Sequence, residues 1–228
     1  MGTELGATTS IFPSDEVTRA FLKAQGREAD FTPLSADPDA AYDRIIHIDL
    51  DTLEPLIACP HMPDKVVPVR SLKGVKVDQV CVGSCTNSSL YDLLKTAAML
   101  KGRTVSPSVS MSVSPGSRQV LTMLANCDAL SDILASGARL LECACGPCIG
   151  QWDRHIGDKT KVNTIIESFN RNFAGRNDGS KKTQAFLASP EIVVAMAING
   201  DMRFNPLTST VTGANGVSFK LATPVGEE

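Results

Sequence analysis

Long apolar runs are missing from this sequence of 228 residues. No stretch approaches the roughly 18 to 20 apolar residues that a membrane-spanning helix needs, so we expect no membrane partner. The first residues show neither the basic and apolar segments of a secretory signal nor the arginine-rich face of a transit peptide. A transit peptide that has been removed would leave no trace, so an organelle origin stays open.

An excess of charge of one sign is also missing. Lysine and arginine total 22 against 25 aspartate and glutamate residues, which gives a formal net charge of -3. This balance argues against a protein that is held to nucleic acid mainly by neutralising phosphates, so we expect no nucleic-acid partner. The phosphate-binding motifs GxGxxG and GxxxxGK followed by Ser or Thr are absent too.

Internal repeats and low-complexity segments are likewise not found. Hydrophobic residues make up 43% of the chain and charged residues 21%, which is typical of a globular protein with a core. The length corresponds to one large domain or to one domain with an appendage.

The first quarter of the chain reads differently from the rest. A helix is predicted from Ser14 to Gly26. The segment 13–16 supplies an N-cap and acidic residues for the first turn, and apolar residues follow at helical spacing. A surface loop follows at 29–41, and the alternation at 44–50 predicts a half-buried strand. Four prolines between 51 and 76 predict an extended connector without long regular elements.

From residue 77 onward, short apolar runs alternate with amphipathic helical patterns. The predicted strands lie at 77–82, 109–113, 138–141, 162–166 and 184–187. The predicted helices lie at 90–102, 117–124, 130–134 and 190–198. This alternation indicates an α/β domain with a mostly parallel sheet, in which ligands bind at the carboxyl ends of the strands.

Cysteine is the residue type that points to chemistry. Seven cysteines are too sparse and too uneven for a disulfide scaffold, and their number is odd, which favours a reducing compartment. For Cys59, Cys81 and Cys127 we expect buried thiols that pack as small apolar side chains.

The other cysteines follow predicted strands. Cys85 lies in the turn after 77–82, and Cys145 and Cys148 form a CxxC motif after 138–141. If the three thiols meet at one edge, they are one ligand short of a closed four-ligand site. By itself the CxxC motif leaves an iron–sulfur cluster, a zinc site and a redox dithiol open.

Polar residues follow the predicted strand at 162–166. Asn170, Arg171 and Arg176 would bring an amide and two guanidinium groups to the same edge. Guanidinium groups bind carboxylates in a bidentate way, and a metal with an open position polarises a substrate oxygen. The combination indicates a polycarboxylate substrate.

Three long motifs in this order resemble the aconitase family. They are 83–89 (GSCTNSS), 144–154 (ACGPCIGQWDR) and 168–178 (SFNRNFAGRND). The similarity extends to 8–13 (TTSIFP) near the start and to 189–193 (SPEIV) near the end. It therefore covers nearly the whole chain.

The resemblance implies a [4Fe-4S] cluster held by Cys85, Cys145 and Cys148. The fourth iron would have no protein ligand and would act as a Lewis acid while citrate is converted to isocitrate through cis-aconitate. By the same resemblance, Asn170 would lie against the cluster.

The resemblance also assigns roles to the two arginines and to parts of the chain. Arg171 and Arg176 would bind substrate carboxylates. The fold would be a three-layer α/β/α domain with a mostly parallel sheet at 44–228, preceded at 1–43 by a helix and loop from the boundary of the preceding domain. A cytoplasmic location is expected, with the mitochondrial matrix as the eukaryotic alternative.

Two departures from the family pattern stand out. Cys143 creates an unusual CxCxxC, in which we expect it to be a spectator. The family's general base and its His/Asp pair lie on other domains, so no catalytic acid or base is expected in this chain, and the remaining aconitase domains are expected partners. Without them the chain would be inactive.

Rival interpretations concern the substrate and the metal. A homoaconitase or an isopropylmalate isomerase-like hydro-lyase would share the cluster. A non-catalytic zinc module would instead recruit Cys143 as a fourth ligand.

Overall fold

The computed structural model describes residues 6–72, 74, 76–158, 160–212 and 216–224. The chain divides into two compact units, Met1–Leu53 and Glu54–Glu228. The expected boundary after residue 43 falls inside the first unit, and the assignment of 1–43 and 44–228 to family domains stays a prediction. Within the described ranges, no helix has the length and apolar character needed to cross a bilayer. Residues 1–5, on which the expectation about leader peptides partly rests, lie outside these ranges.

The first unit contains the predicted helix and little else that is regular. Helix α1 spans Glu16–Ala24, and the Asp15 carboxylate caps it by accepting from the backbone N–H groups of Val17 at 3.0 Å and Thr18 at 3.1 Å. A 3-10 turn, η2, follows at Glu28–Asp30. No residue of α1 is buried, although its sequence has an apolar stripe.

The prediction of a half-buried strand at 44–50 is wrong. The segment is not in a strand, and Ile46, Ile48 and Leu50 are 69%, 68% and 75% exposed. Alternation supplies an apolar face, but a strand also needs a neighbour for its backbone hydrogen bonds. Within the described residues, no strand pairs with this segment.

The predicted connector at 51–76 is only partly irregular. It contains strands β1 (Leu56–Ala58) and β2 (Val66–Pro68), which pair antiparallel, and the 3-10 turn η3 (Val69–Ser71). The prolines limit each strand to three residues rather than preventing strands altogether.

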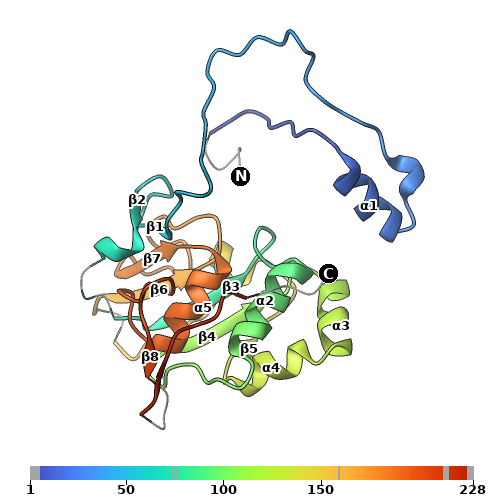
Figure 1. Cartoon of the computed structure of the whole chain (residues 1–228). Coiled ribbons are helices and arrows are strands. Elements are labelled where there is room, and N and C mark those ends of the chain that lie inside the picture. The colour runs from blue at the N-terminus through green and yellow to red at the C-terminus, as the bar shows by residue number, and fades with distance from the viewer. Residues whose placement is uncertain (1–5, 73, 75, 159, 213–215, 225–228) are drawn as a thin grey trace. The chain divides into compact units, whose positions relative to one another are not determined.

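A seven-stranded sheet forms the second unit, in the order β2-β1-β7-β6-β3-β4-β5 (Figure 1). The parallel strands are β3 (Gln79–Gly83), β4 (Ser110–Ser114), β5 (Arg139–Leu140), β6 (Asn163–Glu167) and β7 (Thr183–Leu187). Strand β1 joins β7 in the antiparallel sense. The predicted mostly parallel α/β sheet is therefore confirmed, in agreement with the expected three-layer α/β/α class.

The predicted helices of this unit are confirmed, with small shifts at their ends. They are α2 (Leu90–Leu100), α3 (Arg118–Asn126), α4 (Ala129–Ala135) and α5 (Pro190–Asn199). The side chains of Ser117 and Ser189 cap α3 and α5, and Ser89 forms a capping box with Asp92 at the start of α2. A small hairpin of β8 (Val211–Thr212) and β9 (Ser218–Phe219) was not predicted.

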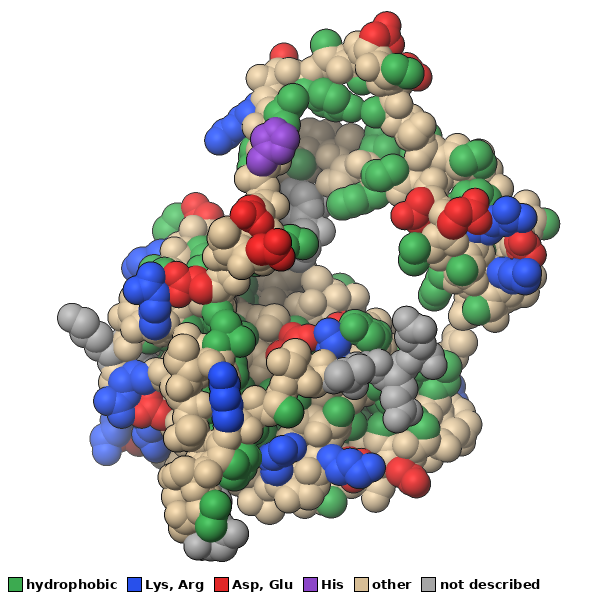
Figure 2. Space-filling view, in the orientation of Figure 1, with side chains coloured by type: hydrophobic (Ala, Val, Ile, Leu, Met, Phe, Trp, Pro, Cys, Tyr) green, Lys and Arg blue, Asp and Glu red, His purple; other side chains and the backbone are tan. Residues whose placement is uncertain are grey.

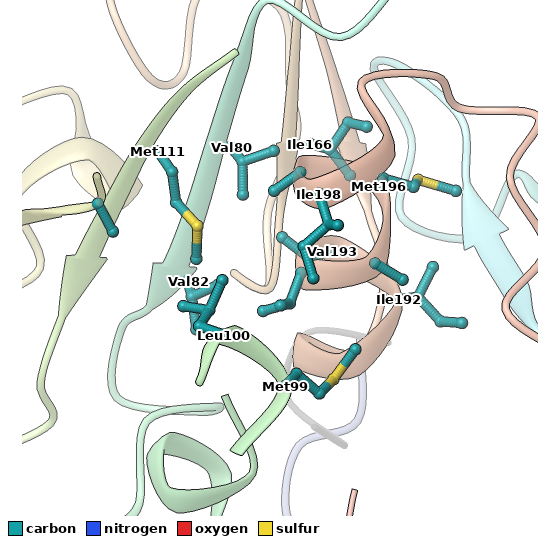
Figure 3. Close-up of a cluster of buried hydrophobic side chains, with 14 of the residues drawn as sticks. Val80, Val82, Met99, Leu100, Met111, Ile166, Ile192, Val193, Met196 and Ile198 are labelled. Atoms are coloured by element: carbon teal, nitrogen blue, oxygen red, sulfur yellow. The ribbon is translucent and has the colours of Figure 1, made fainter. Parts of the chain in front are cut away.

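Alternation along the strands divides the core into two clusters. Val80 and Val82 of β3 point toward α2 and α5, where they meet Leu100 and Val193 (Figure 3). Cys81, between the two valines, points to the opposite face. It belongs to a smaller cluster with Cys148, Ile165, Phe169 and Ala185. The second face of the sheet thus reaches the loop that carries Cys148.

Candidate functional site

Loops from one edge of the sheet carry the residues that the motifs single out. Strand β3 ends at Gly83, just before Cys85, and β6 ends at Glu167, three residues before Asn170. Strand β5 ends at Leu140, and the 3-10 turn η4 (Gly146–Ile149) follows with the CxxC motif. Because these strands are parallel, the loops leave the sheet at the same edge.

The turn after β3 requires glycine at position 83. Its φ is +144°, and a Cβ there would lie 2.3 Å from the backbone oxygen of Ser114 on the neighbouring strand. Ser84 follows with a φ of 70°, and the hydroxyl of Ser88 donates to the Ser84 carbonyl. This tight turn leaves Cys85 exposed at the surface.

The CxxC motif closes on itself as a short turn. The backbone N–H of Cys148 donates to the Cys145 carbonyl at 2.8 Å, and Cys148 is 4% exposed whereas Cys145 is half-buried. The Cys148 thiol donates to Oδ1 of Asn170 at 3.4 Å. Burial, and next the charge of Glu167, raise the pKa of the Cys148 thiol. The structure therefore brings Asn170 and Cys148 together.

The loop after β6 holds both cysteine-bearing loops. Toward the CxxC turn, Nε of Arg176 donates to the Cys148 carbonyl at 2.7 Å, and Nδ2 of Asn177 donates to the Pro147 carbonyl at 3.2 Å. Toward the β3 turn, the Ser168 hydroxyl accepts from the Gly83 N–H at 3.0 Å, and the Ser168 carbonyl accepts from Nδ2 of Asn87 at 2.5 Å. One loop thus connects the surroundings of Cys85 with those of Cys148.

The same loop carries Asn172 and Arg171, which differ in burial. Asn172 is fully buried, and its Nδ2 donates to the carbonyls of Cys59 at 2.8 Å and Ala185 at 3.1 Å. Arg171 is half-buried and interacts with neighbouring protein groups. Asn172 therefore joins the loop to β7 and to the end of β1.

Glu167 is a residue of the candidate site that the sequence patterns do not predict. Its side chain is fully buried at the end of β6, where Oε2 accepts from Nδ2 of Asn177 at 2.7 Å. Within the described residues, Oε1 has no hydrogen-bond partner. Burial raises the pKa of this carboxyl well above its usual range, and the Asn177 hydrogen bond opposes the shift only in part. An acid at the end of the apolar run NTIIE was the available sequence signal.

The cysteines are free thiols in this structure. Of the three predicted to be buried, Cys81 is buried, Cys59 is half-buried, and the prediction is wrong for Cys127, which is exposed as the residue that ends α3. Cys143 is half-buried. Across the described ranges, no set of three or more His, Cys, Asp or Glu side chains is gathered closely enough to hold a metal ion. Cys85, Cys145 and Cys148 thus share an edge without converging on one point.

Known proteins resemble this chain along its length. A sequence model of the aconitase family (aconitate hydratase) matches residues 1–75 and 69–200. The chain is 44% identical to the mitochondrial aconitate hydratases of Candida albicans, over 245 residues, and of Saccharomyces cerevisiae, over 246 residues. It is also 44% identical, over 252 residues, to the mitochondrial homocitrate dehydratase of S. cerevisiae. These alignments cover 99% to 100% of this chain but 32% of each relative, so the chain spans about a third of their length.

Proposed function

Because this chain belongs to the aconitase family, we propose that it forms the cluster-bearing α/β part of an aconitase-type hydro-lyase. The donor set supports this proposal: Cys85, Cys145 and Cys148 are free thiols on loops of one sheet edge, and thiolates are the usual ligands of iron–sulfur clusters. Because the three thiols do not converge in this structure, we propose that cluster binding draws their loops together and that these three residues would then hold a [4Fe-4S] cluster. When bound, it would supply a Lewis acid for the hydroxyl of a tricarboxylate substrate.

The surrounding residues would orient the cluster and the substrate. Asn170, whose Oδ1 accepts from the Cys148 thiol, would stay beside the cluster. Arg176 already uses Nε to hold the Cys148 carbonyl, so we assign its terminal nitrogens to a substrate carboxylate. Arg171 would bind a second carboxylate. No residue of this chain is assigned as the general acid or base.

We propose that the general acid and base come from other parts of a longer polypeptide, since this chain matches about a third of the length of its relatives. The surface of the first unit supports such a partner. Its exposed apolar side chains include Phe12 at 77%, Val17 at 74% and Phe21 at 64%. Figure 2 shows hydrophobic side chains, in green, at the surface of the chain. We propose that other parts of the longer polypeptide cover these apolar side chains.

The same relatives support our proposals for the substrate and the location. We propose citrate as the substrate and keep homocitrate as the alternative, because aconitate hydratase and homocitrate dehydratase match the chain equally well. The relatives are mitochondrial, which favours the mitochondrial matrix. Nothing in the comparisons supports the cytoplasmic expectation.

The observation that carries the proposal is the loop after β6, whose hydrogen bonds link the turns of Cys85 and Cys148. The test is anaerobic reconstitution with iron and sulfide, followed by metal counting and visible absorption. We expect close to four irons per chain in the wild type and in Cys127→Ser, and a loss in Cys85→Ser, Cys145→Ser and Cys148→Ser. Zinc bound at one ion per chain, and lost equally in Cys143→Ser, would overturn the iron–sulfur proposal in favour of the zinc module.

A further inference from the structure

Two buried side chains beneath the CxxC turn are assigned neither to the cluster nor to the substrate in the function proposed above. Glu167 is 0% exposed and Asn177 is 2% exposed. The Asn177 amide has two N–H donors on one nitrogen, and that nitrogen lies 3.2 Å from the Pro147 carbonyl and 2.7 Å from Oε2 of Glu167. Asn177 therefore bridges the CxxC turn and the end of β6.

We propose that Glu167 and Asn177 are positioning residues that fix the backbone of Pro147 and Cys148, so that the Cys148 thiol is held in place for ligation. The assignment of Cys148 as a ligand rests on the proposed function. The placement of the turn by these two side chains does not, because it follows from the hydrogen bonds themselves. Glu167 acts through Asn177 and needs no contact with substrate.

The geometry shows why a carboxyl group suits this position. Oε2 accepts from Asn177 and thereby fixes the orientation of the amide that donates to Pro147. Without that acceptor, an N–H of Asn177 would be buried without a partner, and the amide would be free to turn away from the loop. Arg176, the residue before Asn177, donates to the Cys148 carbonyl, so two successive side chains hold two successive carbonyls of the turn.

The end of β6 serves both cysteine loops through consecutive residues. Glu167 acts on the CxxC turn through Asn177, while Ser168 accepts from Gly83 and Asn87 in the turn of Cys85. A change at Glu167 should therefore disturb Cys148 and leave the Cys85 turn in place. That selectivity separates a positioning role from a general contribution to folding.

The test uses the metal-free full chain and measures the alkylation rate of each cysteine under native conditions by peptide mass spectrometry. Glu167→Gln keeps an acceptor for Asn177 and should retain the wild-type protection of Cys148. Glu167→Leu has a similar size but no acceptor, and we expect Cys148 to react at least tenfold faster while Cys81 stays protected. Asn177→Ala removes the bridge from its other end and should expose Cys148 in the same way, which keeps the test decisive if Glu167→Leu does not fold.

The matched control is Thr183→Val. Thr183 is a buried residue of β7 whose hydroxyl donates to Oδ2 of Asp178 at 2.8 Å and makes no hydrogen bond to Glu167, Asn177 or the CxxC turn among the described residues. It should leave the relative reactivity of Cys148 unchanged. Unchanged protection of Cys148 in both Glu167→Leu and Asn177→Ala would overturn the proposal, as would equal exposure in Thr183→Val or failure of Glu167→Gln to restore protection.

Reconstitution of the same variants gives a second readout. Glu167→Leu should retain less iron than Glu167→Gln and show an altered electron paramagnetic resonance spectrum after oxidation to a three-iron form. If the wild type binds no iron, the proposed function fails, while the alkylation rates still decide the positioning claim. If the wild type binds iron and all variants share one spectrum and one iron content, positioning for ligation is refuted and the proposed function stands.

Discussion

Arg154 and Asp178, the last residues of two of the family motifs, form an ion pair inside the protein. Nη1 of Arg154 lies 3.4 Å from Oδ2 of Asp178, and their side chains are 6% and 3% exposed. The same guanidinium donates to Oδ1 of Asn163 on β6, and Thr183 on β7 donates to Asp178. The pair therefore joins the end of the CxxC motif to the end of the NRNFAGRND motif.

Arg154→Met should be strongly destabilising, because it leaves the buried Asp178 carboxylate without its cation. We expect the free energy of unfolding at neutral pH to fall by about 3–5 kcal/mol, measured by urea denaturation. The double variant Arg154→Met with Asp178→Asn should recover part of this loss. Arg203→Met removes an exposed pair with Asp201 and is the control, since it should leave the midpoint nearly unchanged. An equal effect of the two arginine substitutions would contradict the prediction.

Glu167 should make the chain less stable as pH rises. Burial raises the pKa of its carboxyl in the folded state, so above the unfolded pKa of about 4.3 the unfolded chain is ionised while the folded chain keeps its proton. The free energy of unfolding then falls by up to about 1.4 kcal/mol per pH unit until the folded pKa is reached. Glu167→Gln lacks this group, so its stability relative to wild type should increase from pH 4 upward in urea denaturation.

Glu191 provides the control for that pH dependence, because its shift has the opposite sign. Burial alone would raise the pKa of Glu191, but hydrogen bonds from its own backbone and from Lys95 lower it overall. The stability that it contributes is present above its unfolded pKa and is lost as pH falls through the folded pKa. Glu191→Gln should therefore lose stability relative to wild type as pH rises from 3 to 5, and a parallel response of the two variants would refute the assignment.

Gly83→Ala should disrupt the turn that presents Cys85. The new Cβ would lie 2.3 Å from the Ser114 carbonyl oxygen, and the backbone φ of +144° is unfavourable for a side chain. We expect the strained backbone to lower the free energy of unfolding by about 1–3 kcal/mol, and the steric clash to lower it further. Gly137→Ala, at a φ of +93° with no atom within 4 Å of its Cβ, supplies the strain without the clash. Similar melting temperatures for the two variants would contradict this prediction.

The chain by itself should be nearly inactive after reconstitution with iron and sulfide. General acid and base groups each contribute about 10²- to 10⁴-fold to a rate, and neither is assigned to this chain. Conversion of citrate to isocitrate, followed under anaerobic conditions, checks the prediction. Turnover in the usual enzyme range of about 1–10³ s⁻¹ would show that the residues present suffice.

Sequence patterns predicted those helices and strands whose own residues carry the signal, such as an apolar run or a capping residue. Strand β3 and helix α5 have buried apolar runs, and α5 also has Ser189 and Gly200 as caps, so local information defines both elements. Short strands such as β1 and β8 were missed because they exist only through pairing with a partner. The segment 44–50 failed for the converse reason, since its alternation has no partner within the described residues.

The candidate site was predictable as a set of residues rather than as a geometry. Strand-end positions placed Cys85, Cys148 and Asn170 on one edge, and the contact of Cys148 with Asn170 agrees with that placement. The roles of Glu167 and Asn177 depend on which buried donor meets which acceptor. Such pairings involve residues far apart in sequence and leave no periodic trace.

Both outer strands of the large sheet are poor templates for further strands. Strand β2 has three residues and ends at Pro68, which has no backbone N–H, and β5 at the other margin has only two residues. An incoming chain would therefore find few free backbone groups in register on either side. This arrangement discourages fibre growth by addition of strands to the sheet, although the central parallel strands are strongly apolar.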